Sequence, residues 1–106
     1  MQCTLILPGP VDVSAYQVEV LIEDVTRADD PAVTIARVRV PARSLPRAGN
    51  RLGPVELDFT PPSGHERYVV RARLMVGRYL AAGDLLTTIA IPATGAHSVE
   101  LPLTRA

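Results

Sequence analysis

The sequence predicts an all-β protein, a small antiparallel β-sandwich of about seven short strands in an immunoglobulin-like or transthyretin-like arrangement. Three segments, 16–24, 33–40 and 68–76, alternate apolar with charged or polar residues at the period of two typical of half-buried strands. Ten prolines divide the chain into short pieces, which suits strands and leaves little room for long helices. We expect residues 1–106 to form a single domain, because this length suffices for one hydrophobic core.

The expected strands lie between clusters of turn residues. They span 2–7, 16–24, 33–40, 54–59, 67–77, 86–91 and 98–104, with turns at 9–10, 61–64 and 94–96. The alternative for 14–28 is an amphipathic helix capped by Ser14, but its β-branched residues at period two favour a strand. We expect 41–53 to be an irregular surface loop with a short helical turn around 42–45.

The first expected hairpin joins 16–24 to 33–40. Between them, Asp29, Asp30 and Pro31 favour a turn, because a calcium loop would need further oxygen ligands. Antiparallel pairing would bring opposite charges together on the face away from the core, in a ladder that 67–77 extends. Its expected members are Glu19, Glu23, Arg37, Arg39, Arg71 and Arg73. We interpret this face as solvated and structural, with a surface for an acidic ligand as the alternative.

The same alternation predicts the core, in which many aliphatic side chains and few aromatic ones fill the space between two sheets. The expected core residues are Tyr16, Val18, Val20, Ile22, Ala36, Val38, Val40, Val55, Leu57, Phe59, Tyr68, Val70, Ala72, Leu74, Val76, Ile89, Ile91, Val99, Leu101 and Leu103.

Composition excludes several classes of partner. Eleven arginines balance eleven acidic residues, so we expect no nucleic-acid partner, which would require a positive field. No apolar run reaches the roughly eighteen residues of a membrane span, so we expect no membrane insertion. The single cysteine, Cys3, excludes an internal disulfide and is expected to lie partly buried in the first strand. We expect a cytoplasmic location if Met1 is the native start, and a cell-envelope location if a signal segment has been removed.

No set of residues has the pattern of a reaction centre, and we therefore expect no enzyme, no metal and no cofactor. One cysteine and two well-separated histidines do not match the ligand spacings of zinc sites. The serines lack a nucleophile-elbow motif, and no glycine-rich loop leads from a strand into a helix. The candidate ligand rim is formed by His65, Arg67, Tyr79 and Asp84 at the ends of expected strands.

Four segments carry a family resemblance: Leu7-Pro8-Gly9-Pro10, the hairpin 18–32, the strand 68–73 and Val99-Glu100-Leu101. Together they resemble the YbaY/YscW family of small bacterial lipoproteins, which includes chaperone-like lipoproteins of type III secretion systems. The resemblance implies a compact β-sandwich at the outer membrane and, for the secretion members, help to a secretin that reaches or assembles in that membrane. It implies no catalytic residues.

The leading functional hypothesis is a non-enzymatic, protein-binding or chaperone-like module that adds a partner segment at a sheet edge, either strand 2–7 or strand 98–104. The groove beside the loop 41–53 is the other place considered for this segment. A small-molecule or carbohydrate-binding sandwich, using the rim residues above, is the alternative. Self-association of a purely structural domain is a further hypothesis.

Overall fold

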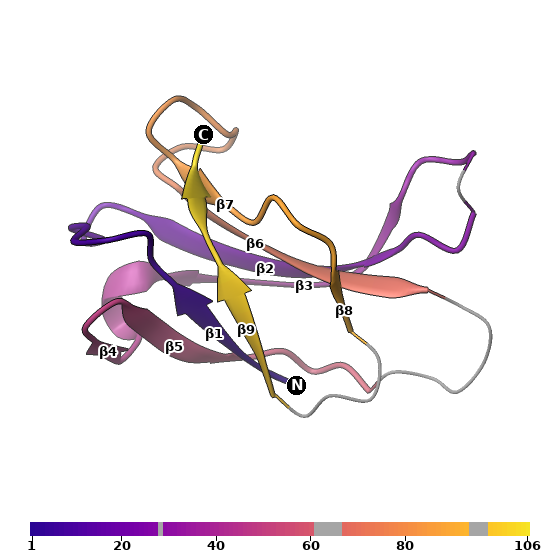
Figure 1. Ribbon diagram of the computed structural model, residues 1–106, viewed down its shortest axis with the longest axis horizontal. Helices are drawn as coiled ribbons and strands as arrows, with labels where there is room; N and C mark the ends of the chain where they lie inside the picture. Colours follow the sequence, from indigo (N-terminus) through magenta and orange to yellow (C-terminus); the bar gives the residue numbers. More distant parts are fainter. Residues whose placement is uncertain (28, 61–66, 94–97) are drawn as a thin grey trace.

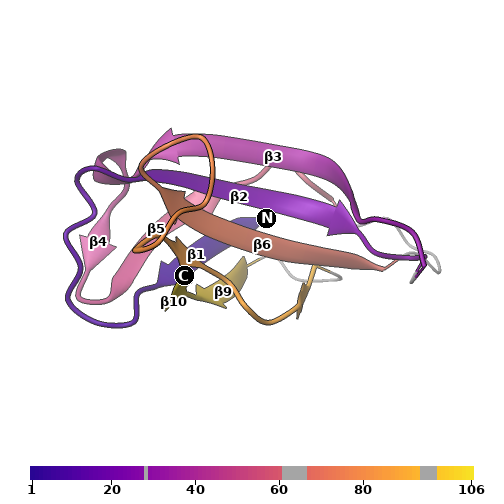
Figure 2. The same ribbon diagram turned by 90° about the horizontal axis from the view of Figure 1, so that it is seen from above.

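The structure, a computed structural model, describes residues 1–27, 29–60, 67–93 and 98–106. Two β-sheets form two layers (Figure 1, Figure 2). The four-stranded sheet consists, in order, of β4 (Arg47–Ala48), β5 (Arg51–Glu56), β1 (Gln2–Ile6) and β9 (Ser98–Pro102). The six-stranded sheet has the order β10-β7-β6-β2-β3, and β8 also pairs with β6. Its strands are β10 (Thr104–Arg105), β7 (Leu85–Leu86), β6 (Tyr68–Met75), β2 (Gln17–Asp24), β3 (Val33–Pro41) and β8 (Ile91–Pro92). The prediction of an all-β, two-sheet fold is confirmed.

The centre of the six-stranded sheet is the expected hairpin. β2 pairs antiparallel with β3, and on its other side antiparallel with β6. Val20 lies opposite Val38 on β3 and opposite Ala72 on β6, so equivalent side chains share one face across three strands. The strand expected for this part of the chain is confirmed, and the alternative helix is wrong, because β-branched residues at period two pair well along a buried sheet face.

The four-stranded sheet has a central strand that the sequence placed at an edge. β1 pairs antiparallel with β5 and parallel with β9, so both sides of strand 2–6 are occupied. Gly53 in β5 lies close to β1: its φ is +132°, and a Cβ there would lie 3.0 Å from the carbonyl oxygen of Cys3. Glycine is required at this position by both the backbone conformation and the close approach.

The core lies between the two sheets and consists mainly of leucine and valine. Inward residues of β2 and β6, such as Val18, Val20 and Leu74, pack in one cluster with Leu5 and Leu101 of the other sheet. Two expected core residues are wrong. Val76 is 63% exposed because β6 ends at Met75, and Ile89 is exposed because the chain leaves the sheet between β7 and β8.

Several predicted boundaries need correction. The segment 41–53 contains the expected helical turn, η1 (Ala42–Ser44), but it continues into a hairpin of β4 and β5 instead of an irregular loop. Strand 86–91 is two short strands, β7 and β8, that both pair with β6. Strand 98–104 is divided at Leu103, where the chain crosses from the four-stranded sheet to the six-stranded sheet. The expected turns 61–64 and 94–96 lie outside the described residues. No described helix is long and apolar enough to cross a membrane.

Candidate functional site

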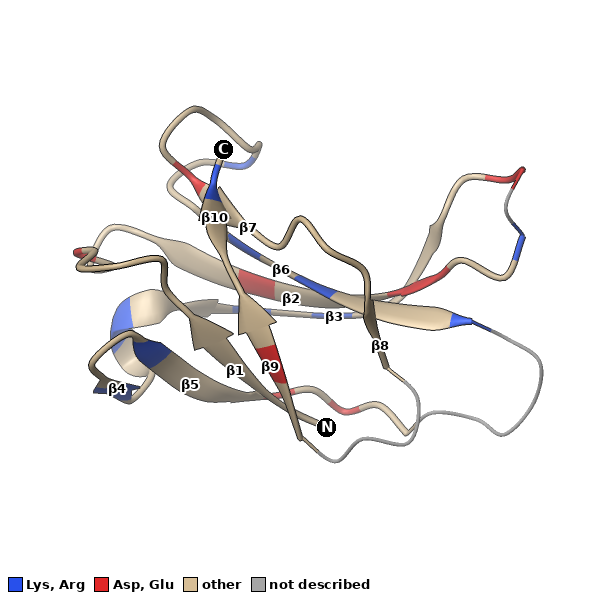
Figure 3. Cartoon of the chain, in the orientation of Figure 1, with Lys and Arg blue, Asp and Glu red and all other residues tan. Residues whose placement is uncertain are grey.

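The outer face of the six-stranded sheet carries a charge ladder, which we define as Glu19, Glu23, Arg37, Arg39, Arg71 and Arg73. Glu19 on β2 lies in register with Arg39 on β3 and with Arg73 on β6, as expected from the sequence. Figure 3 shows the acidic positions on β2 beside basic positions on β6 and β3. The strand pairing therefore places one acidic strand between two basic strands.

Glu19 is the centre of this ladder. Its carboxylate oxygen Oε2 accepts a hydrogen bond of 2.8 Å from Nη2 of Arg39, and it lies 3.9 Å from Nε of Arg37. The other oxygen, Oε1, lies 3.7 Å from Nη1 of Arg73. The Glu19 side chain is only 4% exposed, whereas the three arginines remain 40–57% exposed. The expectation of a simply solvated face is wrong at this residue.

Burial on this outer face extends from Glu19 to a neighbouring apolar residue, Leu21. Leu21 lies between Arg37 on β3 and Arg71 on β6, and it is almost fully buried outside the main core cluster. Long arginine stems can cover an apolar neighbour while their charged ends stay in water. Arg71 also donates a hydrogen bond to Glu23. The charge ladder is therefore a half-buried layer in which arginines lie over β2.

β3 forms the free edge beside this ladder. It is nine residues long and pairs with β2 on one side, and no described strand pairs with its other side. The remaining outer strands of the two sheets are shorter or interrupted: β4 and β10 have two residues each, and β9 contains Pro102. Short strands and prolines are common protections of sheet edges. β3 also ends in a proline, Pro41, but its eight residues from 33 to 40 include none, and it exposes the apolar side chains of Val33 and Ile35.

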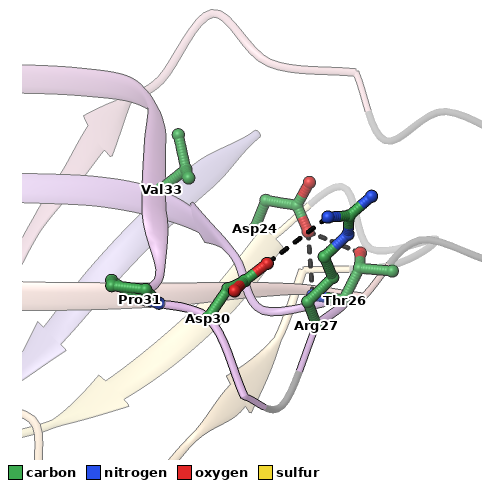
Figure 4. A pocket seen from close by; sticks show the side chains of 6 residues that line it. All are labelled: Asp24, Thr26, Arg27, Asp30, Pro31 and Val33. Carbon is green, nitrogen blue, oxygen red and sulfur yellow. Dashed lines mark hydrogen bonds and ion pairs between the residues drawn. The ribbon is translucent and has the colours of Figure 1, made fainter.

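The loop between β2 and β3 forms a hollow of about 340 Å³ (Figure 4). Its polar groups bind one another. The Asp24 carboxylate accepts hydrogen bonds from the backbone N–H and the hydroxyl of Thr26, at 2.9 and 2.5 Å, and Arg27 forms an ion pair of 3.4 Å with Asp30. The hydroxyl and then the backbone N–H of Thr26 hold the pKa of Asp24 below its ordinary value. The Asp30 N–H also donates to the Arg27 carbonyl, as expected of a turn.

The structure describes three of the four candidate rim residues and does not bring these three together at one end of the sandwich. Arg67 precedes β6, whereas Tyr79 and Asp84 follow the other end of that strand. Tyr79 is 83% exposed, but Asp84 is buried, and its carboxylate accepts a hydrogen bond of 2.8 Å from the N–H of Ala81. His65 lies outside the described residues. A ligand site shared by these four residues stays a prediction.

The described residues do not meet the requirements of a metal site or of a reactive thiol. Among the described residues, no three His, Cys, Asp or Glu side chains are grouped as a metal site would require. Burial raises the pKa of the Cys3 thiol to about 11, so the group is a protonated core side chain at neutral pH.

The sequence predicted the charge ladder but did not predict β3 as the open edge, because strand order depends on contacts between residues far apart in the chain.

Comparisons with known proteins support the fold. No protein-family model matches the chain, and no curated protein matches it. A solved structure described as an alternative pilotin from the type II secretion system of Vibrio cholerae is similar, with a TM-score of 0.72 and 20% sequence identity over 100% of this chain and 95% of that chain. At this identity the likeness shows a shared fold. The resemblance to the YbaY/YscW family stays a prediction.

Proposed function

We propose that this chain is a non-enzymatic, chaperone-like protein-binding module that holds an extended segment of a partner protein against β3. The free edge of β3 is the observation that carries this proposal, because it offers a long row of backbone groups beside exposed apolar side chains. An added strand gains affinity from main-chain hydrogen bonds and specificity from alternate side chains.

The proposed edge differs from the two that the sequence suggested. Strand 2–7 is wrong as an edge, because β1 lies between β5 and β9. β9 is an edge strand, but Pro102 removes one backbone donor from its five residues. The β4–β5 hairpin occupies the segment 41–53, where the sequence predicted a loop beside a groove. β3 is therefore the edge that we assign to the partner.

We infer a partner in a bacterial secretion system and a location in the cell envelope. The similar fold of a type II secretion pilotin and the resemblance to secretion lipoproteins both support this inference. A pilotin-like role needs a binding surface and no reaction centre, and the sequence contains no motif that is typical of a reaction centre.

The test is a titration of the isotope-labelled protein with peptides that tile a type II secretin, followed by backbone amide shifts. We expect one extended peptide to shift the amides of residues 33–40 more than those of any other segment. The matched control is the same peptide N-methylated at alternate residues. It keeps its side chains but loses several main-chain donors, and we expect at least about tenfold weaker binding, because each lost hydrogen bond removes roughly 0.5–1.5 kcal/mol.

Two outcomes would overturn the proposal. In the first, no tiling peptide shifts the β3 amides. In the second, a peptide binds but N-methylation leaves its affinity unchanged, which would show that main-chain pairing does not hold it.

A further inference from the structure

We propose that β3 selects an acidic extended segment, with carboxylates on alternate residues that meet Arg37 and Arg39. This inference rests on the proposed function and adds to it the chemical class of the partner. Arg37 and Arg39 lie two residues apart on β3, in register with Leu21 and Glu19 on the outer face of β2. A strand added beyond β3 would present alternate side chains to the same face.

The charge balance of the outer face favours an acidic partner. The charge ladder contains four arginines and two glutamates, so the difference is two positive charges. Glu23 is paired with Arg71, which leaves Glu19 to be shared by three arginines. One carboxylate cannot neutralise three guanidinium groups, and the excess positive charge therefore lies around Glu19, with two of the three arginines on the open edge strand.

Arg37 and Arg39 still have hydrogen-bond donors to offer. A guanidinium group carries five N–H donors. Arg39 donates one described hydrogen bond, to Glu19, and Arg37 only approaches the same carboxylate at 3.9 Å. Both side chains are about half exposed. A carboxylate on an added strand would lie within reach of these donors, since directly opposed residues on paired strands have Cβ atoms about 4.5–5.5 Å apart.

The local shape of β3 fits this register. A bulge interrupts the β2–β3 pairing around Ile35, so the regular part of the edge runs from Ala36 to Pro41 and contains both arginines. In Figure 1, two connections rise above the six-stranded sheet at its opposite ends: the loop between β2 and β3, and the segment that follows β6. Arg37 and Arg39 both lie in the part of β3 that pairs regularly with β2.

The same arginines disfavour a second copy of this chain as the occupant. If two β3 strands paired antiparallel around Val38, Arg37 of each copy would lie opposite Arg39 of the other. Like charges directly opposed across a strand pair are destabilising. The two arginines of β3 therefore disfavour pairing with a second β3 strand and favour pairing with a negatively charged strand.

The test uses three synthetic peptides of the length of β3, with alternating valine and one variable residue: glutamate, glutamine or lysine. Backbone amide shifts and affinities are measured for the isotope-labelled protein. We expect the glutamate peptide to bind through residues 36–41 and to bind about two- to fivefold more tightly per carboxylate than the glutamine peptide, as for exposed ion pairs. Its affinity should fall as salt is raised.

The matched variants are Arg37→Gln and Arg105→Gln. Arg105 lies on β10, at the opposite edge of the same sheet, and its replacement changes the net charge equally. We expect Arg37→Gln to weaken the glutamate peptide about two- to fivefold and to leave the glutamine peptide unchanged. Arg105→Gln should alter neither. A spectrum that is unchanged away from the substituted residue will show that each variant is folded.

The outcomes separate this inference from the proposed function. Equal binding of the glutamate and glutamine peptides at β3 would overturn acidic selection and leave edge capture standing. Binding of the glutamate peptide without shifts in β3 would overturn acidic selection at this edge, and the secretin peptides then decide the proposed function. Absence of binding by the glutamate peptide would overturn acidic selection, and the secretin peptides then decide the proposed function. Concentration-dependent β3 shifts without peptide would assign the edge to a second copy and overturn the inference.

Discussion

Single charged residues are expected to differ sharply in how much they contribute to stability. Glu19 is buried and close to three arginines, whereas Glu100 forms an ion pair of 2.6 Å with Arg51 in which both side chains are exposed. Water screens an exposed pair and already solvates its members. A buried carboxylate instead depends on its partners, and those partners depend on it.

We therefore expect Glu19→Gln to lower the free energy of unfolding by about 1–3 kcal/mol, because a charge-assisted hydrogen bond is lost in a half-buried layer. Glu100→Gln should lower it by less than about 1 kcal/mol. Denaturant unfolding of both variants checks this. Equal effects would show that burial of Glu19 contributes nothing to the strength of the ladder.

Cys3 gives a second prediction at this scale. Its pKa is raised to about 11 from an ordinary 9.0, first by burial, opposed by the charge of the nearby N-terminus. A raised pKa in the folded state means that the protonated thiol is favoured, so its contribution to stability is complete below pH 9 and is lost as the pH rises toward 11. The loss should reach about 2–3 kcal/mol, at 1.36 kcal/mol per pKa unit.

Unfolding measured between pH 8 and pH 11 checks this, with Cys3→Ala as the control for other groups that titrate in the same range. The variant starts from lower stability but should show a smaller decline with pH. Ellman's reagent at pH 8 should modify the native thiol far more slowly than the unfolded one. A fast reaction of the folded protein would contradict the burial of Cys3.

Among the elements, β6 shows how far alternation determines burial. The sequence predicted a strand over 67–77 with Leu74 and Val76 both in the core. Leu74 is fully buried opposite Val18, but β6 ends at Met75 and Val76 begins an exposed turn. The period of two holds only while the strand remains paired with its neighbours.

We expect Leu74→Ala to lower the free energy of unfolding by about 2–5 kcal/mol, because it leaves a cavity between the sheets. Val76→Ala should change it by no more than about 0.5 kcal/mol, as for most surface positions. Thermal or denaturant unfolding of the pair measures the difference. A large effect of Val76→Ala would place the end of the strand later than the structure does.

The connections between strands were harder to predict than the long strands. Arg47–Ala48 and Arg51–Glu56 lie in a segment rich in arginine, glycine and proline, which resembles a loop, yet they form a hairpin that extends the four-stranded sheet. The short strands β7 and β8 each pair with β6. Local composition carries little information about such strands, because the neighbouring strand provides most of their stabilisation.

At the scale of the whole molecule, strand order decides which edges are open. β1 and β9 pair in parallel although they come from opposite ends of the chain, and this pairing places strand 2–6 in the interior of its sheet. The chain passes from β9, at an edge of the four-stranded sheet, to β10, at an edge of the six-stranded sheet. β3 forms the opposite edge of the six-stranded sheet. The proposed partner edge is thus a property of the assembled sandwich.

The sequence by itself determined the two-layer β fold, the β2–β3 hairpin and the opposite charges on its outer face. These features follow from a period of two and from pairing between strands that are close along the chain. Only the tertiary structure decided that Glu19 is buried, that Arg67 and Asp84 lie at opposite ends of β6, and that β3 is the open edge. Those features depend on which distant segments meet, and the physical reason is that burial and strand order are set by long-range packing, which no local pattern encodes.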